Sequence, residues 1–401
     1  MPWKPWLGAV PGDGATHFRV WAPKAPSLSV KLAGGPSLPL YRDPDGYFTG
    51  RAEGVRAGAR YFYRFADGRE RPDPASLLQP EGVHGPSEVV DLAAIAPQSL
   101  RARVPLERLI FCEIHLGTYT PEGTADAAAR HLAELADALY TAVEVMPVAA
   151  FPGARNWGYD GVSLFAAHAA YGGPAGLARL VDAAHAQGLS AFLDVVYNHL
   201  GPEGNYLGEY GPYFTSKHKT PWGDALDFSL PAVRRYFVEN ALRWVSRAGG
   251  GFDGLRLDAV HGILDDSPTH ILQEIADAVH AEGGLVIAES DLNDVKLIEE
   301  YRLDGSWADD LHHALHVALT GESQGYYADF QDPMPQMATA IERGWFYEGQ
   351  HKPSFGRKHG TPAAHLPARH FVVCAQNHDQ IGNRARGERL VELAGTDAAR
   401  G

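Results

Sequence analysis

The stretch GLRLDAVH, residues Gly254–His261, is the part of this 401-residue sequence that most narrows its fold. It begins as an apolar strand and ends in charge, because Asp258 stands where a strand would pass into a loop. Alternate residues of a strand point to the same face, so Arg256 and Asp258 are expected to share one face. A guanidinium there would keep the carboxylate ionised and fix its direction. For these two residues alone, a structural ion pair at the end of a strand is an equally good interpretation.

Three other apolar segments also lead into polar side chains at the end of a predicted strand. These segments and the polar residues after them are Leu189–Val196 with Asn198 and His199, Leu285–Ala288 with Glu289, and His370–Ala375 with Gln376, Asn377, His378 and Asp379. In a β/α barrel, such strand ends meet at one face, where barrel enzymes keep their active sites. Carboxylates gathered there disfavour one another's ionisation, which is costly unless they serve a function. We therefore expect one active site built from four strand ends.

From about residue 108 the sequence alternates between apolar strands and helices. The predicted strands are Leu109–Ile114, Ala142–Met146, Leu189–Val196, Gly254–Leu257, Leu285–Ala288, Ser306–Ala308 and His370–Ala375. Predicted helices include Ala125–Leu139, capped by Thr124, and two helices that open at Pro174 and Pro231. Apolar strands followed by helices predict a parallel sheet covered on both faces. We expect a (β/α)8 TIM barrel over residues 108–401 that lacks its eighth unit, because only about two dozen residues follow the seventh strand.

Residues 1–90 have a different pattern, which predicts a small immunoglobulin-like β-sandwich. Polar and apolar side chains alternate in Thr16–Trp21 and Ser27–Leu32, as they do in half-buried strands, and Arg60–Phe65 is a further strand. The turn sequence Asp43–Gly46 precedes another short strand. Residues 91–107 are expected to be a linker between the sandwich and the barrel.

Composition and charge limit the classes of partner. The formal net charge of −14 argues against nucleic acid and suits a neutral or cationic ligand. Eight tryptophans and seventeen tyrosines supply flat side chains that can stack on sugar rings. Cys112 and Cys374 stand in apolar segments, which favours buried thiols in a reducing compartment over a disulfide. With no membrane-length apolar segment and no apolar signal core at the N-terminus, a cytoplasmic location is expected, and the oligomeric state stays open.

Two carboxyl groups on either side of a bond are the arrangement used in glycoside hydrolysis. One of them must be ionised to attack the anomeric carbon, and Asp258, with its neighbouring guanidinium, suits that role. The other must carry a proton, and Glu289 follows the apolar residues Val286–Ala288, where poorer solvation favours the protonated form. Asp379, with His378, is expected to bind sugar hydroxyls and to stabilise the oxocarbenium-like transition state.

Four segments resemble, in order and in position, the four motif regions of the α-amylase family of glycoside hydrolases: Asp194–His199, Gly254–His261, Ile287–Ser290 and Gln376–Asp379. The resemblance covers essentially the whole chain, since residues 1–90 are similar to the carbohydrate-binding-type domain that precedes the barrel in glycogen-modifying members. It implies that Asp258 is the nucleophile, Glu289 the general acid/base and Asp379 the transition-state stabiliser.

Further residues are expected to bind sugar, some from the resemblance and others from their place at the strand ends. They are Tyr159, His199, Arg256, His261, Asp310, His312, Gln376, Asn377 and His378. Trp222 and Tyr213, in the loop after the third strand, either stack on distal glucose units or pack that loop, and the sequence favours neither.

No cofactor is expected, and no metal is required. Asn198 stands where some amylases bind calcium, but the loop Gly201–Phe228 offers few clustered oxygen ligands. His312, His313 and His316 lie on a predicted helix, and such spacing more often marks scattered polar residues than a metal site.

Other segments narrow the substrate. Glu113–Thr124 and Asn156–Val162 are similar both to branching enzymes and to family members that release trehalose from maltooligosyl trehalose. The segments that resemble the trehalose-releasing members are Asn198–Tyr206, Thr220–Leu226, Asp309–Ala314 and Gln376–Arg384. The resemblance therefore implies cleavage of the α-1,4 bond next to the terminal trehalose unit, with maltooligosyl trehalose and related α-glucans as partners. The alternatives are a glycogen branching or debranching enzyme, or an inactive glucan-binding fragment.

Overall fold

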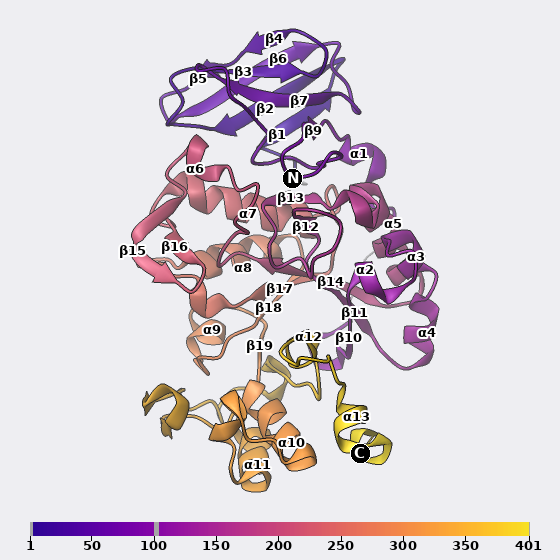
Figure 1. Cartoon of the computed structure of the whole chain (residues 1–401), viewed down its shortest axis with the longest axis vertical. Helices are drawn as coiled ribbons and strands as arrows, with labels where there is room; N and C mark the ends of the chain where they lie inside the picture. Colours follow the sequence, from indigo (N-terminus) through magenta and orange to yellow (C-terminus); the bar gives the residue numbers. More distant parts are fainter. Residues whose placement is uncertain (1–2, 100–103, 401) are drawn as a thin grey trace. The chain divides into compact units, whose positions relative to one another are not determined.

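The computed structural model describes residues 3–99 and 104–400. Within the chain two compact units are distinguished, Met1–Leu285 and Val286–Gly401. The predicted fold class is confirmed: antiparallel sheets come first, and parallel strands with helices follow (Figure 1). Residues 100–103 of the predicted linker lie outside the described residues, as do the chain ends at 1–2 and 401.

The N-terminal region forms two antiparallel sheets (Figure 1, indigo). One sheet has the order β1 (Gly8–Gly12), β2 (Ala15–Trp21), β6 (Tyr47–Glu53) and β5 (Tyr41–Arg42). The other has the order β4 (Ser37–Pro39), β3 (Leu28–Leu32), β7 (Arg60–Phe65) and β8 (Glu70–Arg71), with β9 (Ser87–Glu88) also paired to β7. Phe18 of β2 and Tyr61 of β7 meet edge to face, 5.0 Å between ring centroids. The sheets therefore pack through their apolar faces, as the alternating sequence predicts.

The first unit also holds four parallel strands, in the order β10 (Phe111–Ile114), β11 (Ala142–Val145), β14 (Ser190–Val196) and β17 (Gly254–Asp258). Every residue of β11, β14 and β17 is buried, including the acidic ones. The register pairs Asp194 with Arg256 and Val196 with Asp258 across β14 and β17. The predicted Arg256 and Asp258 therefore lie beside a third charged residue, Asp194, on the neighbouring strand.

Two predicted helix starts are confirmed, because Pro174 lies in the first turn of α5 and Pro231 is the first residue of α7. The α-helices of this unit are α1 (Leu92–Ile95), α2 (Leu116–Tyr119), α3 (Ala125–Ala129), α4 (Leu132–Asp137), α5 (Gly173–Ala186), α6 (Leu207–Tyr210), α7 (Pro231–Val245) and α8 (Ile271–Ala281). The Thr124 hydroxyl accepts a hydrogen bond from the Ala127 amide at 3.2 Å, so the predicted N-cap is confirmed. The single helix predicted over Ala125–Leu139 is wrong in one respect. The amides of Arg130 and His131 bond three residues back, and this tighter turn divides it into α3 and α4.

The second unit contains three parallel strands, in the order β18 (Leu285–Ala288), β19 (Gly305–Trp307) and β22 (Phe371–Val372). Its helices include α10 (Asp309–Thr320), α11 (Pro333–Arg343), α12 (His378–Gly382), α13 (Leu390–Ala394) and α14 (Thr396–Arg400). The predicted strand His370–Ala375 is only two residues long, because β19 offers a partner only as far as Trp307, opposite Val372. Among the helices of the described residues, none is long and apolar enough to cross a membrane.

Candidate active site

The end of β17 is organised around one buried guanidinium, that of Arg256, which is 0% exposed. Its Nη1 donates to Asp194 Oδ2 at 2.7 Å and to Asp258 Oδ1 at 3.1 Å. Its Nε lies 3.8 Å from Glu144 Oε1 on β11. The contact predicted between Arg256 and Asp258 is thus observed. Because all of these groups are shielded from water, the guanidinium makes it possible to keep the carboxylates charged.

Asp258 is held from a second side by Asn198, which lies just beyond β14. Asn198 Nδ2 donates to Asp258 Oδ2 at 2.9 Å and to the Asp258 carbonyl at 2.7 Å. One carboxylate oxygen therefore faces the guanidinium and the other faces the amide, which fixes the orientation of the acid. The chain then turns at Ala259, whose φ of 40° and ψ of 53° lie in the left-handed region that non-glycine residues seldom adopt.

Tyr159 and His199 extend this network. The Tyr159 hydroxyl donates to Asp194 Oδ2 at 2.6 Å, and burial together with that carboxylate raises the pKa of Tyr159, so the hydroxyl stays a donor. His199 Nε2 lies 2.9 Å from the Tyr159 carbonyl, and its Nδ1 contacts Asn198 Oδ1. Burial lowers the pKa of His199. Starting from the Tyr159 hydroxyl, the contacts run through Asp194, Arg256, Asp258, Asn198 and His199 back to the Tyr159 carbonyl.

Trp222 stacks on this network from outside. It lies in the turn between β15 (Phe214–Thr220) and β16 (Gly223–Leu226), and its indole is parallel to the His199 ring at 4.3 Å and 5°. Its side chain is 48% exposed, so part of the indole is accessible to a ligand. His261 is half-buried in the short turn Val260–Gly262 that follows Ala259. Tyr213, by contrast, is buried and packs on Trp21 at 5.1 Å, which favours packing over stacking for that residue.

In the second unit, Glu289 directly follows the buried strand residues Val286–Ala288, as predicted. Its own side chain is half-buried. Asp379 lies in the first turn of α12, and its side chain is 51% exposed. The His378 ring is buried, with Nε2 3.7 Å from Asp379 Oδ1.

Gln376 and Asn377 have local structural partners. The Asn377 side chain accepts from the Asp379 amide at 3.0 Å and so caps α12. Gln376 Oε1 accepts from the Leu390 amide at 2.6 Å, which ties the start of α13 to this loop. These contacts shape the loop that carries Asp379, and a direct contact with sugar stays a prediction for both residues.

Asp310 and His312 lie at the start of α10. Asp310 is 2% exposed, and its Oδ2 accepts from the amides of Phe346 and Tyr347 at 2.9 and 2.8 Å and from Asn293 Nδ2 at 2.8 Å. Burial raises the pKa of Asp310 and lowers that of His312 to about 3. Asp310 therefore anchors the Phe346–Tyr347 segment, and the sugar contacts of both residues stay predictions.

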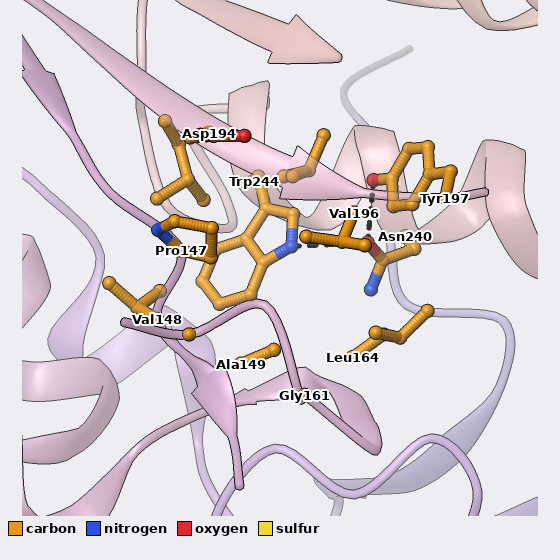
Figure 2. A pocket seen from close by; sticks show the side chains of 13 residues that line it. Pro147, Val148, Ala149, Gly161, Leu164, Asp194, Val196, Tyr197, Asn240 and Trp244 are labelled. Atoms are coloured by element: carbon orange, nitrogen blue, oxygen red, sulfur yellow. Dashed lines mark hydrogen bonds between the residues drawn. The ribbon is translucent and has the colours of Figure 1, made fainter. Parts of the chain in front are cut away.

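Asp194 also lines a small cavity formed by β14, α7 and residues between 147 and 164 (Figure 2). Asn240 Oδ1 accepts there from the Tyr197 hydroxyl at 2.6 Å and from Trp244 Nε1 at 3.1 Å. Asp194 is its one charged lining residue, and most of the others are apolar. We assign this cavity to packing of the strands against α7. Within the described ranges, no group of three or more His, Cys, Asp or Glu side chains could hold a metal ion.

The structure thus brings four of the predicted residues, Tyr159, His199, Arg256 and Asp258, into one connected network within the first unit. Sequence reasoning missed the roles of Asn198 and Glu144. A signal for Glu144 was present, since it is an acid inside the otherwise apolar strand Ala142–Val145. No local signal showed that Asn198 binds Asp258, because the two are sixty residues apart.

Comparisons with known proteins show which family the chain is similar to. The model of the alpha-amylase catalytic domain matches residues 64–222. The chain is 46% identical over 390 residues to the malto-oligosyltrehalose trehalohydrolase of Saccharolobus solfataricus, covering 95% of this chain and 69% of that protein. It is also 46% identical to the malto-oligosyltrehalose trehalohydrolase of Deinococcus radiodurans, covering 97% of this chain and 65% of the relative. The chain therefore spans about two thirds of the length of these relatives.

A solved structure is similar to this chain in both sequence and fold. The crystal structure of a putative alpha amylase from Salmonella typhimurium superposes with a TM-score of 0.93 at 40% identity, over 98% of this chain and 69% of that one. A pullulanase from Anoxybacillus, at 20% identity and a TM-score of 0.72, shares the fold.

Proposed function

The chain belongs to the malto-oligosyltrehalose trehalohydrolases, glycoside hydrolases of the alpha-amylase family, and on that premise we propose that it cleaves the α-1,4-glucosidic bond next to the terminal trehalose unit of maltooligosyl trehalose. The observation that carries this proposal is the fixed carboxylate of Asp258, held between Arg256 and Asn198 at the end of β17. Its substrates are α-glucans, and the product released is trehalose.

Asp258 is proposed as the nucleophile. Attack on an anomeric carbon needs an ionised carboxylate in a defined direction, and a guanidinium with an amide supplies both. Retention of configuration then requires a second carboxyl group about 5 Å away, which gives its proton to the leaving oxygen. We assign this role to Glu289, supported by its place directly after a buried apolar strand.

Asp379 is proposed to stabilise the charged transition state, together with His378. Its exposed carboxylate and the nearby imidazole can both bind the hydroxyl groups of the reacting glucose. For the function to be correct, Asp258, Glu289 and Asp379 must act on one glycosidic linkage.

On the first unit, Tyr159, His199 and Trp222 are proposed to bind the glucose at the point of cleavage. The exposed part of the Trp222 indole suits the apolar face of a sugar ring, and the half-buried His199 is stacked on the same indole. His261, Asp310, His312, Gln376 and Asn377 are retained as candidate sugar contacts.

We also propose a division into a carbohydrate-binding-type sandwich at 1–90, a linker at 91–107 and a catalytic barrel from 108 onward. A cytoplasmic location is proposed from the substrate class and from Cys112 and Cys374, both of which are thiols.

Chromatography of the products tests the function. Maltooligosyl trehalose incubated with the 401-residue chain should yield free trehalose and a maltooligosaccharide, whereas amylose and branched glucan should react much more slowly. Asp258→Asn should abolish trehalose release and leave substrate binding measurable by calorimetry. Asp137→Asn, at the exposed end of α4, is the matched control and should keep its activity. Preferred cleavage or transfer on branched glucan would instead favour a branching or debranching enzyme, and binding without turnover would favour a glucan-binding protein.

A further inference from the structure

The N-terminal sandwich contacts the loop Leu200–Tyr213, which we call the bridging loop. This loop leaves β14 directly after His199 and leads into the β15–β16 hairpin, whose turn carries Trp222. The loop therefore connects two parts of the proposed substrate site, His199 before it and the hairpin that carries Trp222 after it, and these two rings are stacked. The middle of the loop lies on the sandwich.

Tyr210 is the buried anchor of the bridging loop. It is 0% exposed, and its ring centroid lies 5.1 Å from that of Phe65 and 6.2 Å from that of Tyr63, both on β7. Its hydroxyl donates to the Pro72 carbonyl at 2.9 Å, and its own carbonyl accepts from the Lys24 amide at 3.1 Å. The Tyr210 side chain is thus packed on β7, and its backbone is tied to the turn between β2 and β3.

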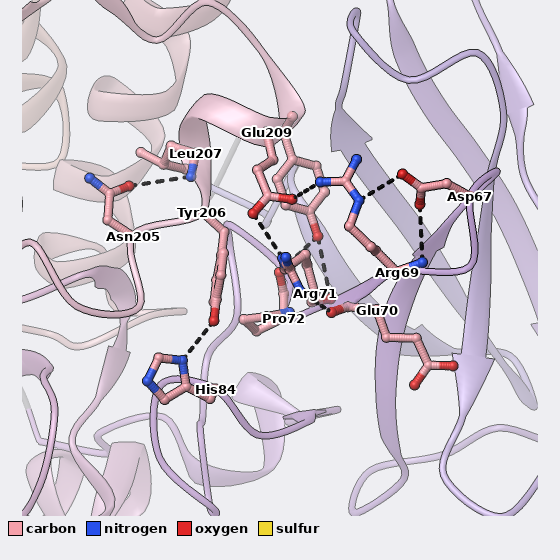
Figure 3. Close-up of polar contacts among 11 residues, drawn as sticks. Asp67, Arg69, Glu70, Arg71, Pro72, His84, Asn205, Tyr206, Leu207 and Glu209 are labelled. Atoms are coloured by element: carbon pink, nitrogen blue, oxygen red, sulfur yellow. Dashed lines mark hydrogen bonds and ion pairs between the residues drawn. The ribbon is translucent and has the colours of Figure 1, made fainter.

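Glu209, next to Tyr210, adds a charged clamp (Figure 3). One carboxylate oxygen accepts from Arg71 Nε at 2.9 Å, and the other pairs with Arg69. The Arg71 guanidinium also lies over the Tyr206 ring, 4.6 Å from its centroid. The Tyr206 hydroxyl is in turn hydrogen-bonded to His84 Nδ1 at 2.6 Å, as Figure 3 shows.

Close packing leaves the loop little freedom at its glycines. A Cβ at Gly204 would lie 2.5 Å from Val83, and one at Gly211 would lie 2.7 Å from the Trp21 ring. The loop backbone therefore lies directly against sandwich side chains. A shift of the sandwich surface would be passed to the loop and so to the hairpin that carries Trp222.

We propose that the sandwich is a positioning element for the substrate site, and that Glu209, through Arg69 and Arg71, is a positioning residue that keeps Trp222 stacked on His199. This inference rests on the proposed function only for its effect on substrate. The clamp is partly exposed, with 28% of the Glu209 side chain accessible, and such ion pairs add little to global stability. Its loss should therefore loosen the loop around Tyr206 and Glu209 without unfolding the chain.

The test compares Glu209→Gln with Glu53→Gln. The control removes a carboxylate that pairs with Arg51 on the sandwich, away from the bridging loop. The first readout needs no substrate: the emission of Trp222, isolated by subtracting the spectrum of the same protein with Trp222→Phe. Glu209→Gln should make that emission brighter and more accessible to acrylamide, because the indole leaves the His199 ring, whereas Glu53→Gln should leave it unchanged.

The second readout is kinetic. Glu209→Gln should raise KM for maltooligosyl trehalose by about two- to tenfold, the range expected for loss of one aromatic contact, with kcat changed by less than about twofold. If Glu209→Gln does not fold, Tyr206→Phe serves instead, since it removes only the hydroxyl that meets His84. Equal Trp222 emission in the clamp and control variants overturns the inference. If Glu209→Gln alters the Trp222 emission but the unmodified chain releases no trehalose, the positioning role of Glu209 is supported. In that case only the proposed function is refuted.

Discussion

Replacing Asn198 with alanine should reduce catalytic efficiency, because its amide is one of the two groups that orient the carboxylate of Asp258. The bond from Nδ2 to Oδ2 is 2.9 Å long, and a second bond of 2.7 Å reaches the Asp258 carbonyl. A hydrogen bond to a charged group contributes about 1.5–3 kcal/mol. If that whole contribution is lost from the transition state, kcat/KM falls by about 10- to 160-fold, since each 1.36 kcal/mol corresponds to about tenfold.

The assay is kcat/KM for maltooligosyl trehalose, with trehalose measured by chromatography, alongside urea unfolding of the same variants. Asn198→Asp is the sharper companion, because it puts a carboxylate in place of the amide that faces Asp258 and should cost more activity than Asn198→Ala. The reasoning would be refuted if Asn198→Ala, still fully folded in urea titrations, lost less than about threefold in kcat/KM, or if Asn198→Asp were the more active of the two.

Three further predictions concern stability. Thr124→Ala should lower the free energy of unfolding by about 1 kcal/mol through loss of the α3 cap, with activity unchanged; urea titration measures it, and an unchanged midpoint would contradict the cap assignment. Arg256→Met should cost about 3–5 kcal/mol, because it leaves the carboxylates of Asp194 and Glu144 buried without their cation, and a loss under about 1 kcal/mol would mean that they are not charged together. Burial raises the pKa of Asp73 to about 6. The native state therefore holds a proton that the unfolded state, with an aspartate pKa near 3.9, releases, so the contribution of Asp73 falls by about 3 kcal/mol as pH rises from about 4 to about 6. Against Asp73→Asn, the wild-type chain should lose relative stability across that window, and parallel stability–pH curves would show that Asp73 titrates normally.

The strands could be predicted where burial alone determines them. Leu189–Val196 was expected as a strand, and β14 covers Ser190–Val196 with every residue buried. The β15–β16 hairpin was missed, because Phe214–Thr220 is largely polar and only its pairing with β16 makes it a strand. The strand conformation of Phe214–Thr220 is stabilised by hydrogen bonds to β16 and not by burial. A pattern of polar and apolar residues therefore does not reveal it.

In the candidate site, contacts between residues close in sequence could be predicted, and contacts between residues far apart in sequence could not. The contact between Arg256 and Asp258 follows from strand periodicity, since the two residues are two positions apart. The hold of Asn198 on Asp258 depends on the register that sets Val196 opposite Asp258, which no local pattern encodes. The cap at Asn377 could have been predicted, because Gln380 stands three residues later and completes a capping box.

The left-handed backbone conformation at Ala259 determines which substitution at this position would stabilise the chain. A glycine there would relax the backbone at once, whereas alanine keeps the conformational penalty one peptide away from the proposed nucleophile. Glycine adopts this backbone region without a steric cost. A chain under selection for heat resistance would therefore gain stability by exchanging alanine for glycine at this one position.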